Sequence, residues 1–240
     1  MGRTPRTIYK LYTWLFLFPF VALCTGIFGS ACIITSITAG EEYTDIFAVI
    51  WAKIACFLVP VKVDVSGKEN FSPDQSYIIV VNHQSLVDII ILHAYLKLKI
   101  KWIMKKELEK VFLFGHACKK LGCIYVDRYN HDSALDSMQE AQKNLSKTSS
   151  VIFFPEGTRS KDGTLGEFKK GAFRFAMATR LPILPVTIKD SMKILPCETY
   201  DVTPGSAEVI IHPPIDMNNK SLDDLDKLVL RTKETIAAVL

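Results

Sequence analysis

A histidine and a carboxylate lie five residues apart in the segment 82–88, directly after the apolar run 77–81. On a continuous helix, five positions turn through about 500°, which would leave His83 and Asp88 about 140° apart and out of contact. With His83 in a turn and Asp88 in the first turn of a following helix, the two side chains can meet. A carboxylate on one ring nitrogen orients the imidazole and makes the other nitrogen a better base. The alternative is structural, with Ser85 as a helix N-cap and Asp88 as its capping-box partner.

A second group of residues suited to chemistry follows the apolar run 151–154. Its sequence is Pro155-Glu156-Gly157-Thr158-Arg159-Ser160. Glycine permits a close backbone approach, and arginine presents a planar fork that matches the geometry of a phosphate. An ordinary turn after a strand accounts for the proline and the glycine. It does not account for the charged Glu156 and Arg159 on either side of Gly157.

Both groups depend on the elements that position them. Strand-like apolar runs lie at 61–65, 77–81, 101–104, 123–126, 151–154, 183–188 and 207–211, with helical patterns between several of them. One helical pattern covers 134–145, and another follows a capping-box start at Ser221 and Asp224. This alternation predicts an α/β domain with a largely parallel central sheet flanked by helices. Chemistry in such domains lies in the loops at the carboxyl ends of the strands, where both groups occur.

The first sixty residues have a different character. Residues 11–40 contain no charged side chain. As a helix they would be about 45 Å long, against a hydrocarbon core of roughly 30 Å. A second apolar stretch covers 46–61. A cleaved signal peptide would fit the basic start, but the run is too long and lacks a clear cleavage site. We therefore divide the chain into membrane-anchoring hydrophobic helices at 1–60 and an α/β domain at 61–240.

Charge and cysteine usage argue against two classes of function. The net charge of +4 gives no reason to expect nucleic-acid binding, and the six cysteines form no C-x-x-C pair, so we expect no metal site. Scattered, apolar-flanked cysteines indicate free thiols in a reducing compartment. A basic cluster fits either a solvated helix face or attraction to anionic lipid or to a phosphorylated substrate. Its members are Lys97, Lys99, Lys101, Lys105, Lys106, Lys110, Lys119 and Lys120. Lys105 follows the run 101–104, which makes it a candidate for contact with a phosphate.

Four segments together resemble the glycerolipid acyltransferases, and most closely the 1-acyl-glycerol-3-phosphate (lysophosphatidate) acyltransferases. The pattern N-H-x-x-x-x-D at 82–88 is similar to the first block of that family, and F-P-E-G-T-R-S at 154–160 to the third. G-C-I-Y-V-D-R at 122–128 resembles the second block, and L-P-V at 184–186 the fourth. One short block would be weak evidence, but four in order over about residues 60–215 make a specific match.

The resemblance implies a role for particular residues. His83 is similar to the general base of the family, and Asp88 to the carboxylate that supports it. The positions that bind the glycerol phosphate acceptor correspond to Arg128, Glu156, Gly157, Thr158 and Arg159.

The expected reaction moves a fatty acyl group to the sn-2 hydroxyl of 1-acyl-glycerol 3-phosphate, which gives phosphatidic acid in phospholipid biosynthesis. By resemblance the donor is acyl-CoA or an acyl carrier protein, with no cofactor. A thioester is already activated, so the enzyme chiefly deprotonates and positions the hydroxyl. Backbone N–H groups at the start of the helix after His83 are candidates for stabilising charge on the thioester oxygen. We interpret Ser85 as an N-cap, because no G-x-S-x-G elbow surrounds it.

Three alternatives stay open at this point. The acceptor could be glycerol 3-phosphate or another lysophospholipid, because the motifs do not resolve the acceptor pocket. A lipid hydrolase would use water as acceptor, but it would require an activated serine elbow. A non-catalytic membrane or lipid-binding protein would have no need for His83 and Asp88 together.

Two expectations disagree about the side of the membrane on which the catalytic domain lies. The basic start favours a cytoplasmic N-terminus, so a single span would place the catalytic domain outside. Free thiols and a cytoplasmic thioester donor place that domain inside. Two crossings, or a re-entrant hairpin with breakers at Pro19, Gly26 and Gly29, would satisfy both. We expect a shallow or even-crossing anchor among membrane lipids, with the catalytic domain facing the cytoplasm.

Overall fold

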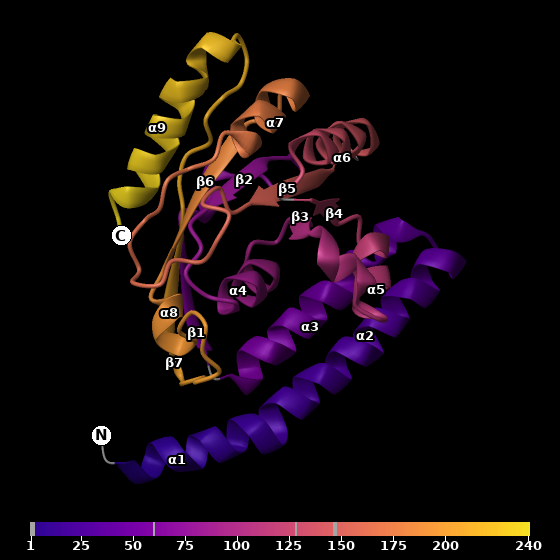
Figure 1. Ribbon diagram of the computed structural model, residues 1–240, viewed down its shortest axis with the longest axis vertical. Helices are drawn as coiled ribbons and strands as arrows, with labels where there is room; N and C mark the ends of the chain where they lie inside the picture. Colours follow the sequence, from indigo (N-terminus) through magenta and orange to yellow (C-terminus); the bar gives the residue numbers. More distant parts are fainter. Residues whose placement is uncertain (1–2, 60, 128, 146–147) are drawn as a thin grey trace.

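The computed structural model describes residues 3–59, 61–127, 129–145 and 148–240. Its centre is a seven-stranded sheet in the order β1-β7-β6-β2-β5-β3-β4 (Figure 1). Only β6 and β7 pair antiparallel among the described strands, and the other neighbours pair parallel. The largely parallel α/β sheet predicted from the sequence is therefore confirmed. The strands are β1 (Val61–Ser66), β2 (Ile78–Val81), β3 (Lys99–Lys105), β4 (Ile124–Val126), β5 (Ser149–Phe153), β6 (Ile183–Lys189) and β7 (Gly205–Ile211).

Burial explains why these segments form strands. Every residue of β2 and β5 is buried, because helices cover both faces of the sheet at its centre. β1 and β7 alternate between more and less buried residues, as expected where one face is better covered. On one face, α4 (Val87–Tyr95) and α8 (Ser191–Ile194) pack against the sheet. On the other lie α6 (His131–Asn144), α7 (Gly171–Thr179) and α9 (Leu225–Ala237).

The last helix begins as the sequence predicts. The Ser221 side chain accepts a hydrogen bond from a backbone N–H in the first turn, and the Asp224 carboxylate accepts one from Ser221 N at 3.0 Å. This capping box starts a short 3-10 turn (Leu222–Asp224), which continues directly into α9. The capping pattern therefore located the start of the C-terminal helix correctly.

The N-terminal helices form a hairpin. A continuous helical segment runs through α1 (Arg3–Tyr12), a π-helical turn (Thr13–Leu17) and α2 (Phe18–Thr38). The π turn lies just before Pro19, whose ring removes a backbone donor and crowds the preceding turn. The chain then reverses at Gly40, which has φ +120°, and returns as α3 (Asp45–Leu58). The predicted breakers are therefore wrong. Pro19 is tolerated near the start of α2, and Gly26 and Gly29 lie inside it, facing α5 (Phe114–Lys120).

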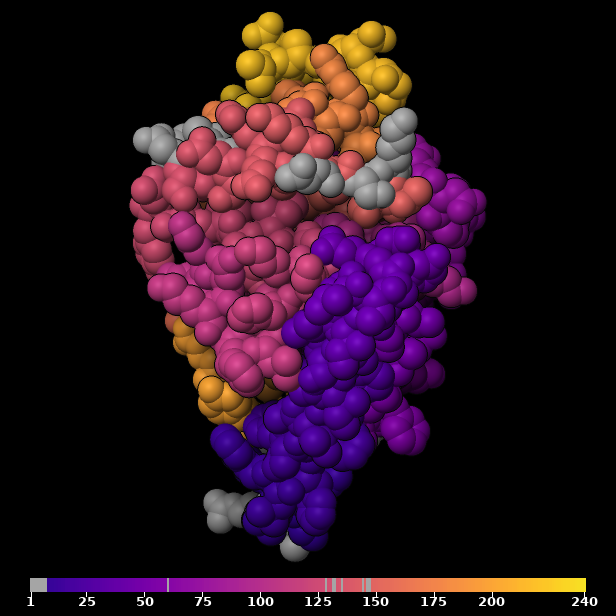
Figure 2. Space-filling view, turned by 90° about the vertical axis from the view of Figure 1, so that its right-hand side faces the viewer, coloured from indigo at the N-terminus to yellow at the C-terminus, as the bar shows by residue number. Residues whose placement is uncertain are grey.

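The hairpin completes the core of the α/β domain. Leu17, Ala52, Cys56 and Val59 belong to the same buried cluster as β2, β6 and α4. One side of α2 packs against α3 and α5, where Cys24 and Cys32 are buried. Figure 2 shows the N-terminal helices as a ridge across one face of the molecule. The division into membrane-anchoring helices at 1–60 and an α/β domain at 61–240 stays a prediction.

The outer side of the ridge is apolar. Among the described residues, one helix, from residue 8 to 38, is long and apolar enough to cross a membrane. Many of its large hydrophobic side chains are exposed rather than buried. They are Ile8, Leu11, Trp14, Leu15, Phe16, Phe20, Leu23, Ile27, Ile34 and Ile37. A continuous apolar surface of this kind is typical of contact with lipid or with another protein.

Candidate active site

The two groups of residues identified from the sequence lie at the same edge of the sheet. β2 and β5 are parallel neighbours, with Val80 opposite Phe153, so the segments that follow them leave the sheet side by side. The Asn82 side chain fixes the end of β2 to β6. Its Nδ2 donates to Ile188 O and its Oδ1 accepts from Ile188 N, both at 2.8 Å. The turn that contains His83 therefore begins from a fixed position.

His83 and Asp88 meet in the turn between β2 and α4. His83 Nδ1 lies 2.8 Å from Asp88 Oδ2, and the Asp88 side chain is fully buried. The same carboxylate oxygen accepts from Gln84 N at 2.8 Å and from Ser85 N at 2.9 Å. Asp88 Oδ2 therefore has both of the roles predicted from the sequence. It pairs with the His83 ring, and it accepts hydrogen bonds from the backbone at the start of the helix. The helix begins one residue later than the cap predicted at Ser85, with Leu86 at the N-cap position.

The second loop holds His83 in place. The His83 ring stacks on Phe154, with 3.7 Å between ring centroids and 10° between planes. His83 N donates to Glu156 Oε1 and His83 O accepts from Ser160 N, each at 2.8 Å. Because Nδ1 faces the carboxylate, Nε2 is the ring nitrogen left to accept a proton. The arrangement therefore presents an oriented base.

The Glu156 carboxylate is engaged by backbone groups. One oxygen accepts from His83 N, and the other accepts from Gly166 N at 2.9 Å. It thereby joins the turn after β2, the turn after β5 and the loop that precedes α7. These contacts are those of a residue that holds loops together, so direct binding of substrate by Glu156 stays a prediction.

The remaining predicted acceptor-binding residues lie on the same turn. Gly157 has φ +77°, a conformation that favours glycine, and a Cβ atom there would lie 2.8 Å from Lys169 Nζ. Thr158 is exposed and Arg159 half-buried. Within the described residues, the Arg159 guanidinium makes no hydrogen bond or ion pair. Arg128 lies outside the described residues. Lys169 was missed by the sequence analysis, although it places a cation beside this turn.

Lys105 and the basic cluster have mixed surroundings. Lys105 ends β3, and its ammonium lies 3.3 Å from Glu107 and 5.5 Å from the centre of the Tyr129 ring. Three other members are paired with carboxylates: Lys101 with Asp45, Lys119 with Glu109 and Lys120 with Glu41. Those three pairs favour a structural interpretation for much of the cluster, whereas Lys105 stands beside the cavity described below.

Ser85 is held as a structural residue. Its hydroxyl donates to Leu195 O at 2.7 Å and accepts from Val87 N at 3.2 Å. Because Asp88 N is bonded to Ser85 O, and Gln84 N and Ser85 N to the Asp88 carboxylate, four N–H groups at the start of α4 are occupied. These four groups are therefore not free to stabilise a thioester oxygen, contrary to our expectation for this turn.

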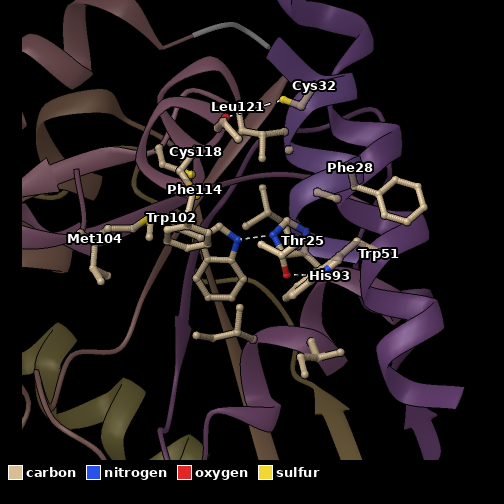
Figure 3. Close-up of a pocket in the computed structure, with 18 of the residues that line it drawn as sticks. Thr25, Phe28, Cys32, Trp51, His93, Trp102, Met104, Phe114, Cys118 and Leu121 are labelled. Atoms are coloured by element: carbon tan, nitrogen blue, oxygen red, sulfur yellow. Dashed lines mark hydrogen bonds between the residues drawn. The ribbon is translucent and has the colours of Figure 1, made fainter. Parts of the chain in front are cut away.

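His83 lines an apolar cavity of about 490 Å³. Figure 3 shows the cavity with other residues of its wall, among them Thr25 and Trp51. α2 and α3 form one wall, α4 and β3 a second, and α5 a third. Sequence analysis missed it, because the N-terminal helices carry no motif and their place on the domain depends on tertiary packing. A signal was available on α4, where residues 86, 89, 90 and 93 share one helical face. Lining residues include Thr25, Phe28, Trp51, His83, Leu86 and Phe154.

Comparison with known proteins gives a consistent result. The chloroplastic 1-acyl-sn-glycerol-3-phosphate acyltransferase of Brassica napus is 38% identical over 177 residues, which are 73% of this chain and 51% of that protein. The human 1-acyl-sn-glycerol-3-phosphate acyltransferase alpha is 32% identical over 184 residues, 76% of this chain and 65% of that protein. This chain thus spans about half to two thirds of the length of these curated relatives.

Structural similarity extends further along the chain. The crystal structure of the 1-acyl-sn-glycerophosphate acyltransferase PlsC from Thermotoga maritima matches with a TM-score of 0.80 and 28% identity. The match covers 97% of this chain and 98% of that one, so it includes the N-terminal hairpin. The family model for acyltransferases matches residues 62–189, more than half of the chain, which runs from β1 through the catalytic edge to β6. The chain therefore belongs to the acyltransferase family.

Proposed function

We propose that this chain transfers a fatty acyl group from a thioester to the sn-2 hydroxyl of 1-acyl-glycerol 3-phosphate, giving phosphatidic acid for phospholipid biosynthesis. The observation that carries the proposal is the place of His83. Its ring is oriented by Asp88 and lines the apolar cavity, so a base and a site for an acyl chain adjoin. The names of the related proteins support the same acceptor.

The chemistry follows from this arrangement. The acceptor O–H gives its proton to His83 Nε2 as its oxygen attacks the thioester carbonyl. The Asp88 carboxylate stabilises the resulting imidazolium through Nδ1. The C–S bond then breaks, and the thiol leaves with the proton that His83 carried. No covalent enzyme intermediate and no cofactor are needed, because the thioester is already activated.

The acceptor phosphate is assigned to the turn after β5. Arg159 offers a planar fork that has no hydrogen-bond or ion-pair partner among the described residues, and Lys169 adds a second cation beside Gly157. Lys105 lies at the end of β3 beside the cavity and is placed for a further contact with phosphate. Glu156 contributes by positioning, since its two oxygens hold the His83 turn and the 166 loop.

The donor is acyl-CoA or an acyl carrier protein, and the protein acts at a membrane with its catalytic domain facing the cytoplasm. The apolar outer side of α1 and α2 supports membrane association. Its inner side stays packed on the domain, which favours a shallow anchor over an isolated span. In a cysteine-free background, single cysteines near Arg6 and Asp162 should both resist a membrane-impermeant reagent in intact cells. Labelling at only one of them would contradict this topology.

The test of the reaction is an assay of the purified protein with acyl-CoA and acyl carrier protein thioesters against a panel of acceptors. The panel contains 1-acyl-glycerol 3-phosphate, glycerol 3-phosphate, other lysophospholipids and water alone. Product masses should show phosphatidic acid as the main product and little free fatty acid. A preference for glycerol 3-phosphate or another lysophospholipid would change the acceptor, and predominant hydrolysis would refute the transferase assignment. The His83→Ala variant is the negative control, because product formed without His83 does not come from chemistry at this site.

A further inference from the structure

The cavity wall contains few polar side-chain donors, and nearly all are already used. Trp51 Nε1 donates to the Thr25 hydroxyl at 3.0 Å, and that hydroxyl donates to Val21 O at 2.8 Å. Trp102 Nε1 donates to His93 Nε2 at 2.5 Å (Figure 3). His83 uses Nδ1 on Asp88 and belongs to the catalytic turn. Apart from the turn that carries His83 and from Lys105, the ring of His93 is the one nitrogen or oxygen group lining this wall, among the described residues, whose donor is not yet assigned to a partner.

The tautomer of His93 follows from its partner. An indole N–H can only donate, so His93 Nε2 must accept and cannot carry a proton. Burial, and then the charge of Lys101, lower the pKa of His93 to about 4, which keeps the ring neutral near pH 7. A neutral imidazole with an unprotonated Nε2 carries its proton on Nδ1. No described residue hydrogen-bonds to Nδ1. His93, which lines the cavity, therefore carries an N–H donor that has no hydrogen-bond partner among the described residues.

This donor lies along the cavity and away from the catalytic end. Leu86, Ile89, Ile90 and His93 share the face of α4 that lines the cavity. Seven residues separate Leu86 from His93, a rise of about 10 Å along a helix. Two further ring contacts, Trp102 to Phe154 at 5.9 Å and Phe154 to His83 at 3.7 Å, separate His93 from the base. The thioester belongs at the base, so His93 stands beside the middle of a bound chain.

We propose that His93 Nδ1–H is a recognition site for an oxygen atom in the middle of the acyl chain. The inference rests on the proposed function, because it takes the cavity as the place of the acyl chain. An unsubstituted chain strips water from this N–H and gives it no partner, which is unfavourable. A keto or epoxide oxygen supplies the missing acceptor. A hydroxyl does so less well, because its own hydrogen also needs a partner in an apolar wall.

The test is a competition between stearoyl-CoA and the positional isomers of oxostearoyl-CoA, with product masses as the readout. The purified full chain should prefer one mid-chain isomer over its neighbours by roughly 3- to 10-fold, the effect of one hydrogen bond. The hydroxystearoyl isomers should show a weaker maximum at the same position. If CoA thioesters are not substrates, the same chains are presented on acyl carrier protein.

Two variants assign the effect to His93. His93→Phe removes both ring nitrogens, and it is combined with Trp102→Phe because the indole N–H would otherwise lose its acceptor and could bind the same oxygen. In this double variant the positional maximum should disappear while stearoyl transfer continues. His93→Gln should retain the maximum, because its amide oxygen can accept from Trp102 and its amide nitrogen can donate. A flat positional profile in the wild type, or a maximum that survives in the double variant His93→Phe with Trp102→Phe, overturns the proposal. Failure of every thioester to transfer would instead refute the proposed function. A flat wild-type profile overturns the proposal even if neither variant folds.

Discussion

Asp88 Oδ2 accepts three hydrogen bonds, one from the ring of His83 and two from the backbone of the turn that carries it. The other carboxylate oxygen is buried and has no partner within the described residues. All three hydrogen bonds therefore fall on one oxygen atom, which both orients the base and closes the first turn of α4. A change at Asp88 should consequently affect chemistry and stability together, whereas a change at His83 should affect mainly chemistry.

We expect His83→Ala to lower turnover by about 10²- to 10⁴-fold, the usual contribution of a general base. Asp88→Asn should lower turnover too, and should also reduce the free energy of unfolding by about 1–3 kcal/mol, because charge-assisted bonds in a buried turn are lost. Steady-state kinetics and denaturant unfolding of both variants measure these effects. A destabilised Asp88→Asn variant whose folded fraction keeps full activity would reduce Asp88 to a cap.

A substitution at Arg159 can separate the effect of charge from that of hydrogen-bond geometry at the turn proposed to bind the acceptor. Arg159→Lys keeps the positive charge but loses the two-pronged hydrogen bonding, so the KM for the acceptor should rise by roughly 10-fold while the KM for the donor changes little. The matched control is Arg180→Lys, because the Arg180 guanidinium donates to Met217 O and Lys220 O on a different loop. Initial rates measured while each substrate is varied separately show whether the acceptor KM or the donor KM has changed. A rise confined to the donor KM would show that Arg159 contacts the other substrate.

At the scale of elements, the sequence predicted the sheet well because its signals are local. All seven apolar runs became strands, and the capping box marked the start of the last helix. The meeting of His83 with Glu156 and Phe154 was only implied, since it depends on β2 and β5 being neighbours. The hairpin turn at Gly40 was not predicted, because Pro19, Gly26 and Gly29 are stronger local breakers but are accommodated in α2. Tertiary contacts, and not the local sequence, therefore determine where the chain reverses.

The hairpin forms one wall of the cavity, so its side chains should limit the acyl chain. Ala48 on α3 lines the cavity, and Ala48→Phe would fill part of it. We expect kcat/KM for long acyl thioesters to fall by roughly 10-fold or more, with a smaller change for short ones. Lys53→Phe is the matched control, because Lys53 is exposed on the same helix and does not line the cavity. A uniform loss across chain lengths would indicate damage to folding instead.

At the scale of the whole molecule, the catalytic edge, the cavity and the apolar ridge lie on one connected part of the structure. α2 contributes Thr25 and Cys32 to the cavity wall with one side and exposes Leu23 and Ile27 on another. A lipid acceptor and an acyl chain both come from or enter an apolar phase. Contact of the ridge with a bilayer would therefore bring the cavity close to the phase that holds its substrates.

Membrane binding should depend on the outer side of α2 and not on general surface hydrophobicity. Leu23 and Ile27 are exposed, four residues apart on one helix face, and neither lines the cavity. A variant that combines Leu23→Glu and Ile27→Glu loses about 3–6 kcal/mol of apolar burial in lipid. Its partition onto anionic vesicles should fall by at least about 100-fold, while activity on detergent-dispersed substrate should persist because the active site is unchanged.

The control for that variant combines Leu222→Glu and Leu230→Glu, at exposed leucines at the start of and within the α9 region (Figure 1). It adds the same charge and removes the same kind of side chain, but on an element that packs against the opposite face of the sheet from α3 and α4. Vesicle cosedimentation of the wild type and both variants, with melting temperatures for each, provides the comparison. Equal loss of binding in the two variants would make the effect one of net charge. Undiminished binding of the α2 variant would show that another surface holds the protein on the bilayer, since two buried carboxylates cannot remain in the hydrocarbon region at so small a cost.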